Sequence, residues 1–534
     1  MLIQTFMLLV FGYIFWEKII KLYYNYWYYT SQGIVPTDFP LPIIGGLHNF
    51  AQLIKRLDKY NEHPSIEYIK WRVGENLPPM VYDLKIPTGA IVINDPDVVQ
   101  ELFSTSKAKY LDKYSQNAGL FEALTGKDGL PGMKTQDPNL SIRRKHVSAA
   151  FYKDRLTIQL EAVIKLTFNR LKDMKEALNE SNNEINLTSW LGEMVMHSIQ
   201  ICVFGLDSND LKLDYIEQGK IQTLPLSMFM KKLSVQLFVR IIKVYRLCFS
   251  SLNSFYIGQQ EQEYRQNALF FRQFLKDVIS QRRKRISEGY QSNDFVDLLI
   301  RDELYEGKDE TILDECCIFM LGATQTTVTT INNALIYIYK DNQILQKLRE
   351  EIAQNFNFKD ISLLTSEHWI KQFNYDKMSS ESTYIQKIVS ETLRIEPPFR
   401  LSARYELTET LELKGYRIKK GDPLLFNIYG LSRDPKTWIE PEKFIPERFD
   451  PDSKYFLTPD GKKRKSSSYI PFFGGLRVCV GKTFADSFVK TIIPIIVNLI
   501  DFEFIDKSIF EKKIPISIGV EPEIKVKASF RKDF

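Results

Sequence analysis

The stretch "FFGGLRVCVG", from Phe472 to Gly481, sets one cysteine between glycines and an arginine. Its spacing is F-x-x-G-x-R-x-C-x-G, and the fixed positions are Phe472, Gly475, Arg477, Cys479 and Gly481. Glycine lets a loop turn tightly and brings backbone N–H groups close to the sulfur. The residues that follow, 483–500, have helical periodicity and predict a helix that begins just beyond the cysteine.

These features favour an ionised cysteine. Backbone N–H donors and a helix N-terminus both stabilise a thiolate. A thiolate on a loop without a second ligand residue is suited to bind haem iron as its axial ligand. A lone cysteine in a turn is more often a small buried residue. Because Ala485 adds a sixth match to the pattern, we interpret Cys479 as an iron ligand.

Composition narrows the class of protein. The chain has 534 residues, of which 44% are hydrophobic and 26% charged, so a large packed core is expected. The net charge of +5 is weak and no dense basic run appears, which argues against nucleic acid as a partner. The cysteines are odd in number and irregularly spaced, which argues against a disulfide framework and suits a reducing compartment. They are Cys202, Cys248, Cys316, Cys317 and Cys479.

The N-terminus has a different composition. Residues 1–16 are almost entirely apolar, but about 15 residues of helix reach only about 22 Å, short of a hydrocarbon core of about 30 Å. The span becomes long enough through Tyr29 if Lys18 and Lys21 extend their charges to the interface. Tyr and Trp at 23–29 suit that interface. We therefore expect residues 1–30 to form a single-pass anchor, with a signal peptide or a buried helix as alternatives.

Beyond the anchor we predict two further segments. Residues 31–50 contain Pro36, Pro40 and Pro42 and are expected to form a stiff, extended strap. Residues 51–534 show no composition shift and are expected to form one large, mostly helical domain with small β-sheets. Helices are predicted at 160–180, 260–284, 309–340, 343–355, 380–394 and 483–500. Strands are predicted at 88–96 and within 406–426, with a hairpin over 414–422.

With the cysteine motif, the chain resembles the cytochrome P450 family, specifically its membrane-anchored eukaryotic type. The motif E-x-x-R occurs in "ETLR" as Glu391 and Arg394, and "PERF" supplies Arg448 about fifty residues later. The resemblance implies that these three residues form a buried network with a structural role. It also implies the cytochrome P450 fold and a haem b cofactor whose iron is bound by Cys479.

Three arginines match family positions that bind the haem propionates. They are Arg477 in the cysteine motif, Arg404 after the Pro-Pro turn, and Arg144 in the helix of a W-x-x-x-R motif. Two carboxylates need cations or other donors. Leu140 stands where that motif has tryptophan, which removes one N–H donor. A solvated basic face is the alternative for Arg144.

The segment "GATQTT", residues 322–327, matches the oxygen-binding pattern of the family. Its small residues would leave room for dioxygen, and the hydroxyl of Thr326 would donate a hydrogen bond to dioxygen or to a nearby water. Gln325 stands where the family has an acid. An amide cannot ionise, although it can orient a water molecule. We expect protons to pass through Thr326 and water, with Gln325 beside them.

The resemblance implies a monooxygenase that inserts one oxygen atom of O2 into a small lipophilic substrate. No nucleotide-binding motif for NADPH or flavin is present, so electrons would come through NADPH-cytochrome P450 reductase, sometimes with cytochrome b5. Residues 221–257 would cover the pocket and touch the bilayer. The protein would lie in the endoplasmic reticulum membrane and face the cytosol. Two alternatives stay open: an isomerase or dehydratase acting on oxygenated lipids, and a non-catalytic haem sensor.

Overall fold

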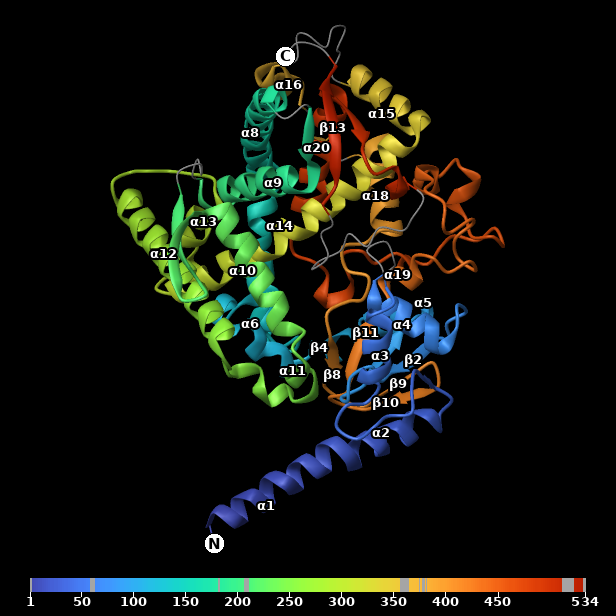
Figure 1. The fold of residues 1–534 in the computed structure, drawn as a ribbon. Helices are drawn as coiled ribbons and strands as arrows, with labels where there is room; N and C mark the ends of the chain where they lie inside the picture. The colour runs from blue at the N-terminus through green and yellow to red at the C-terminus, as the bar shows by residue number, and fades with distance from the viewer. Residues whose placement is uncertain are drawn as a thin grey trace.

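The computed structural model is mostly helical and carries four small β-sheets among its described residues (Figure 1). It describes residues 2–57, 63–180, 183–205, 211–355, 365–373, 375–376, 380, 382–510 and 523–531. The helices gather on one side of the molecule, and the larger sheet lies on the other side with α2 to α5 (Figure 1). Separate hydrophobic clusters fill the helical part and the sheet part.

The predicted helices are confirmed, and several more are present. The α-helices are α1 Leu2–Phe15, α2 Lys21–Thr30, α3 Leu47–Ile54, α4 Pro64–Val73, α5 Pro96–Phe103, α6 Ala118–Thr125, α7 Pro138–Ser148, α8 Lys153–Glu180, α9 Leu187–Phe204, α10 Leu226–Ile241, α11 Val244–Cys248, α12 Gln259–Ser287, α13 Phe295–Arg301, α14 Asp309–Lys340, α15 Asn342–Asn355, α16 Ser366–Gln372, α18 Tyr384–Ile395, α19 Ile428–Leu431 and α20 Lys482–Leu499. Helix α14 crosses the middle of the molecule and contacts α9, α12, α18 and α20. Its position makes it the element around which the helical core is built.

The largest sheet joins the two ends of the chain. Its strand order is β1-β2-β3-β11-β8-β4, and β11 from the C-terminal half pairs in parallel with β3 from the N-terminal half. The strands are β1 Val35–Pro36, β2 Met80–Asp83, β3 Ala90–Ile93, β4 Leu111–Lys113, β5 Glu184–Asn186, β6 Lys212–Glu217, β7 Lys220–Pro225, β8 Tyr405–Leu407, β9 Leu411–Leu413, β10 Tyr416–Ile418, β11 Pro423–Phe426, β12 Ile500–Phe504 and β13 Lys525–Phe530. The hairpin predicted over 414–422 is present as β9–β10 but begins three residues earlier, and it turns at Lys414 and Gly415, both with positive φ.

Helix α2 packs against the sheet, whereas α1 before it extends away from the body (Figure 1). Leu22 and Tyr29 of α2 are buried, and the Tyr29 hydroxyl donates to Asp422 Oδ2 at 2.5 Å. The side chain of Gln32 exchanges two hydrogen bonds with the backbone of Arg417. Among helices in the described part of the chain, none has both the length and the apolar composition needed to cross a membrane.

A fully buried carboxylate ties α18 to the loop that follows α19. The two arginines of the predicted network bind Glu391: Arg394 Nε lies 2.7 Å from Oε2, and Arg448 Nε lies 3.1 Å from Oε1. The backbone N–H of Ile445 donates to the same Oε1 at 2.8 Å. The remaining guanidinium N–H groups donate to backbone carbonyls of Ser432, Ile439, Glu440, Pro441 and Lys443. All three charges are therefore paired, as burial requires.

We predict that Arg448→Met lowers the free energy of unfolding by about 3–5 kcal/mol, because it leaves Glu391 buried with one cation fewer. Urea unfolding of the full chain, followed by circular dichroism, measures this change. The matched control is Lys443→Met, which removes an exposed ion pair with Glu440 and should cost less than about 1 kcal/mol. A change for Arg448→Met no larger than that of the control would contradict the structural role of the network.

A second buried ion cluster joins α10, α11 and α12. Both Arg240 and Arg246 bind the carboxylate of Glu261, with Arg240 Nη1 at 2.6 Å from Oε2. Burial alone would raise the pKa of Glu261, but hydrogen bonds from Arg246, Tyr245 and the Ile257 amide lower it to about 2. The cluster fixes the segment between α10 and α12 to the helical body.

The low pKa of Glu261 gives a pH prediction. A carboxyl whose pKa is lowered by folding stabilises the protein above its unfolded pKa, here near 4.5. That contribution is lost as pH falls from 4.5 toward 2. In Glu261→Gln the free energy of unfolding should therefore decline less steeply over this range than in the wild type. Equal slopes in urea titrations at stepped pH values would show that the carboxylate is not stabilised in this way.

Candidate active site

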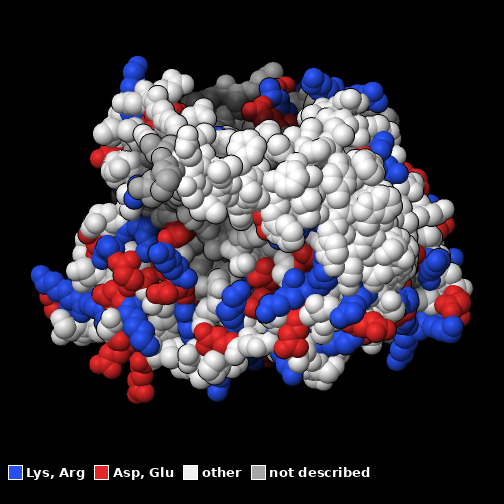
Figure 2. Space-filling view, turned by 90° about the horizontal axis from the view of Figure 1, so that it is seen from below, with Lys and Arg blue, Asp and Glu red and all other residues white. Residues whose placement is uncertain are grey.

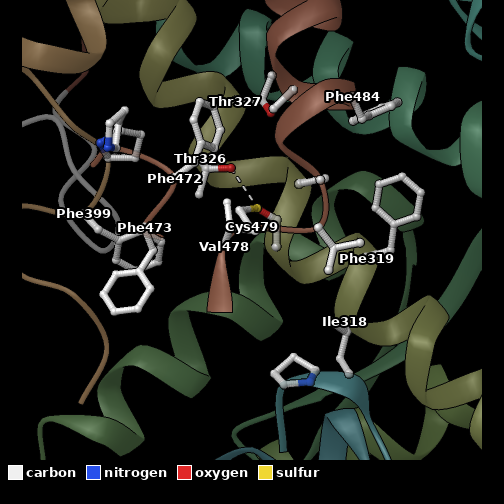
Figure 3. Close-up of a pocket in the computed structure, with 18 of the residues that line it drawn as sticks. Ile318, Phe319, Thr326, Thr327, Phe399, Phe472, Phe473, Val478, Cys479 and Phe484 are labelled. Atoms are coloured by element: carbon white, nitrogen blue, oxygen red, sulfur yellow. Dashed lines mark hydrogen bonds between the residues drawn. The ribbon is translucent and has the colours of Figure 1, made fainter. Parts of the chain in front are cut away.

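A cavity of about 400 Å³ lies between α14, α18 and the cysteine loop. Its walls are mostly apolar and aromatic, and they include residues of both halves of the chain. Figure 3 shows Cys479, on the loop before α20, between Thr326 and Phe319 of α14. None of the described residues in 221–257 lines this cavity. The segment that was predicted to cover the pocket therefore contributes no residue to the cavity lining.

The cysteine loop is held by its backbone and by aromatic packing. The N–H of Cys479 donates to the carbonyl of Phe472 at 2.9 Å. Phe473 has φ of 62°, unusual for a residue with a side chain. Its ring stacks on Tyr405 with centroids 4.5 Å apart. A Cβ on Gly474 would lie 2.5 Å from the ring of Phe103, so this position requires glycine.

The thiol of Cys479 faces the cavity. Its accessible surface opens into the cavity, whereas the other four cysteines are buried. Burial by the surrounding protein raises the pKa of Cys479 above its usual value, although the backbone N–H of Gly481 and the charges of Arg144 and Lys113 act in the opposite direction. The expected donors are present, but in the chain without haem they do not outweigh the loss of water around the sulfur.

Helix α14 presents small and hydroxyl side chains to the same cavity. Gly322, Ala323 and Thr326 line it, and Thr326 Oγ1 donates to the carbonyl of Gly322 at 2.8 Å. The buried hydroxyl of Thr327 has no hydrogen-bond partner among the described residues, so it is available to a water or a ligand. Gln325 is not among the lining residues.

Three cations line the cavity, and two of them were predicted. Arg477 Nη2 pairs with Asp112 at 2.9 Å. Arg144 Nη2 donates to the carbonyl of Val478. The third is Lys113, whose Nζ donates to the hydroxyl of Tyr405 at 2.7 Å. Burial, followed by repulsion from Arg477, lowers the pKa of Lys113 to about 8 and also lowers that of Arg144.

The two other positions considered for propionate binding, Arg404 and Leu140, do not contribute to the cavity lining. Arg404 does not line the cavity, and its guanidinium has no hydrogen bond within the described part of the chain. Burial lowers the pKa of Arg404, and the charges of Tyr114 and Asp83 oppose this effect only in part. Leu140 lies in α7 one turn before Arg144 and is only 4% exposed, so a core side chain fills the usual place of tryptophan.

The cavity suits a haem. An apolar slot with one thiol on its wall offers a single axial ligand to iron. Only one of the three lining cations, Arg477, has a carboxylate partner among the described residues, so Lys113 and Arg144 remain to receive the two haem carboxylates. The positive charges and the thiol lie on one connected surface.

Sequence reasoning missed Lys113 and a buried acid. Lys113 ends β4 in "YLDKY" and carries no motif, so only the pairing of β4 with β8 brings it to the cavity. Glu315 lies on α14, lines the cavity and pairs with Arg143. Burial raises the pKa of Glu315 to about 7, against the opposing charge of Arg143. Glu315 lies three helical turns before Thr326, so the two residues share one face of α14. This spacing could have identified the acid from the sequence.

We predict that Lys113→Met and Arg144→Met each weaken haem retention roughly tenfold or more, because each removes a charge-assisted contact to a carboxylate. The rate of haem transfer to apomyoglobin measures this without reference to activity. The control is Lys109→Met, an exposed lysine that precedes the same strand and does not line the cavity. Transfer at the control rate in both variants would contradict the assignment.

Several curated proteins are similar in sequence to this chain. The curated relatives include (S)-N-methylcoclaurine 3'-hydroxylase isozyme 2 of Eschscholzia californica, 32% identical over 44% of this chain and 45% of the relative. Tabersonine 16-hydroxylase 2 of Catharanthus roseus is 34% identical over 37% of this chain and 36% of the relative. The chain thus spans less than half the length of these two relatives. Cytochrome P450 704C1 of Pinus taeda is 26% identical over 91% of this chain and 89% of its own length.

The family profile described as Cytochrome P450 matches residues 71–526, which is most of the chain. The matched range contains α14, the Glu391 network and the cysteine loop. This chain therefore belongs to the cytochrome P450 family.

Proposed function

We propose that this protein is a haem-thiolate monooxygenase that inserts one atom of dioxygen into a small lipophilic substrate. The observation that carries the proposal is the thiol of Cys479 on the wall of a large apolar cavity, with Thr326 on another wall. The relatives named as hydroxylases support the same reaction class. When bound, haem b supplies an iron centre that activates dioxygen.

The residues of this chain have separate tasks in that reaction. Cys479 provides the anionic sulfur ligand, and Lys113 and Arg144 hold the propionates. The apolar walls keep water from the reacting centre. Thr326 holds a hydroxyl at the cavity, where it orients a water and passes a proton, and the unpartnered hydroxyl of Thr327 extends this polar track. Gln325, away from the lining, would act only through a water it orients.

Electrons would come from NADPH-cytochrome P450 reductase, with cytochrome b5 as a second donor. Of the basic residues near the sulfur side, Arg143 pairs with Glu315 and Arg144 lines the cavity. Lys145 and Lys482 are exposed and remain to attract an acidic partner.

We further propose that the leading segment attaches the protein to the endoplasmic reticulum membrane, with residues 51–534 as the catalytic domain in the cytosol and 31–50 as the strap. Leu8, Leu9 and Phe11 of α1 are 69–75% exposed. Exposing so many neighbouring apolar side chains to water costs free energy, and such patches usually mark a contact with a membrane or another protein. Seen from below, an uncharged band crosses the face on which α1 lies, and charged side chains gather along one border (Figure 2). Such a surface suits the bilayer interface and a lipophilic substrate that enters from it.

One alternative has a specific observation in its favour. Because Gln325 replaces the acid and lies away from the cavity lining, an enzyme that rearranges an oxygenated lipid without external electrons would also tolerate it. A non-catalytic sensor would have no need for the hydroxyl-bearing face of α14.

Oxygen uptake by the haem-loaded full chain separates these functions. We predict uptake that depends on both NADPH and reductase, rises with the apolar ether 7-ethoxycoumarin, and releases its dealkylated fluorescent product. Cys479→Ala should abolish it. Linoleic acid 13-hydroperoxide, supplied without reductase, tests the isomerase alternative. Rapid conversion of that hydroperoxide with no reductase-dependent uptake would overturn the monooxygenase proposal.

A further inference from the structure

A second cavity lies where the leading helix meets the body of the protein. It has a volume of about 70 Å³ and a largely polar lining. The leading helix contributes Glu17, Lys18 and Lys21, and the body contributes Ser250 and Ser251 beside the end of α11. One water occupies roughly 10–15 Å³ on this measure, so the cavity has room for a group of about five heavy atoms.

Lys18 is the unusual residue of this cavity. It is only 8% exposed. Its ammonium forms no hydrogen bond or ion pair with any described residue, and its nearest recorded partner is the ring of Phe249, 5.2 Å from Nζ to the centroid. A buried ammonium without an anion is costly. The cavity that Lys18 lines is the place from which an anion can reach it.

The other charges around the cavity already have partners. Lys21 Nζ lies 3.1 Å from Glu17. Asp422 lies 3.6 Å from Lys419 Nζ. Both carboxylates therefore pair with other lysines, and Lys18 keeps only the attraction of the charge on Glu17, which does not offset its burial.

Neutral donors complete the lining. The hydroxyl of Thr88 is buried without a hydrogen-bond partner among the described residues. The hydroxyls of Ser250 and Ser251 and the amide of Gln116 border the same space, and the Ser250 hydroxyl already donates to Oε1 of Gln116. One ammonium with several hydroxyl and amide donors suits a small oxyanion with several acceptor oxygens.

The backbone around Lys18 departs from the regular helix. Residues Trp16–Ile20 form a π-helical segment between α1 and α2. Such insertions are rare and are found mostly at functional positions. This segment lies just after the exposed apolar side chains of α1, at the depth where a helix leaving a bilayer would meet lipid phosphates.

We propose that this cavity binds a phosphate oxyanion, with Lys18 as its counter-ion and the neighbouring hydroxyl groups as donors. The phosphate comes either from a phospholipid headgroup or from free phosphate. The site itself stands on the geometry of Lys18, and only the lipid source rests on the proposed membrane attachment.

Thermal unfolding of the haem-loaded full chain in non-ionic, phosphate-free detergent tests the site. Sodium phosphate, compared with sodium chloride at equal ionic strength, should raise Tm by several degrees through binding to the folded state. The increase should vanish in Lys18→Met and persist in Lys55→Met, a control that removes an exposed lysine outside the cavity. Without phosphate, Lys18→Met should have a higher Tm than the wild type, because it removes an uncompensated buried charge.

The source of the phosphate is tested with dihexanoylphosphatidylglycerol below its micellar concentration. If the lipid reaches its half-maximal Tm shift at a lower concentration than inorganic phosphate does, the natural ligand is a lipid headgroup. If inorganic phosphate reaches it at the lower concentration, the natural ligand is free phosphate. No shift with either compound, or an equal shift in Lys18→Met, would overturn the site. Haem content and oxygen uptake should not change in Lys18→Met. A failure of the phosphate-site proposal can therefore be distinguished from a failure of the proposed monooxygenase function.

Discussion

The hydrogen bond from the N–H of Cys479 to the carbonyl of Phe472 closes the loop on which the thiol is carried. That loop passes through left-handed conformations at Phe473 and Gly475, and the one at Phe473 costs free energy because this residue carries a side chain. The aromatic rings packed around Phe473 offset that cost, because the ring fits between Tyr405 and Phe426. Packing of the loop against the sheet therefore helps to set the direction of the sulfur.

The remaining parts of the structure support this loop and shape the space in front of it. Helix α18 carries Glu391 on one face and lines the cavity with Val389 and Leu393 on another. Tyr469, which precedes the loop, donates to a carbonyl of the same helix at 3.0 Å. The buried ion network and the cavity thus share one rigid element, so a change in one reaches the other.

Much of the fold was predictable because apolar periodicity marks long helices, and α12, α14 and α20 lie close to their expected ranges. The hairpin β6–β7 was not predicted, although Gln218-Gly219 at its turn is a signal for it. Motif residues such as Cys479 and Arg477 were found because their spacing is specific. Lys113 was not, since pairing between distant strands brings it to the cavity and no local pattern records such pairing.

The most direct test of the account is the absorption spectrum of the reduced, full-length protein with carbon monoxide. If the sulfur of Cys479 binds haem iron, the wild type should show the long-wavelength Soret band of a thiolate-ligated complex, and Cys479→His should shift it to the position of an imidazole-ligated haem. A wild-type band at the imidazole position, or an unshifted long-wavelength band in Cys479→His, would contradict the assignment of this thiol as the iron ligand.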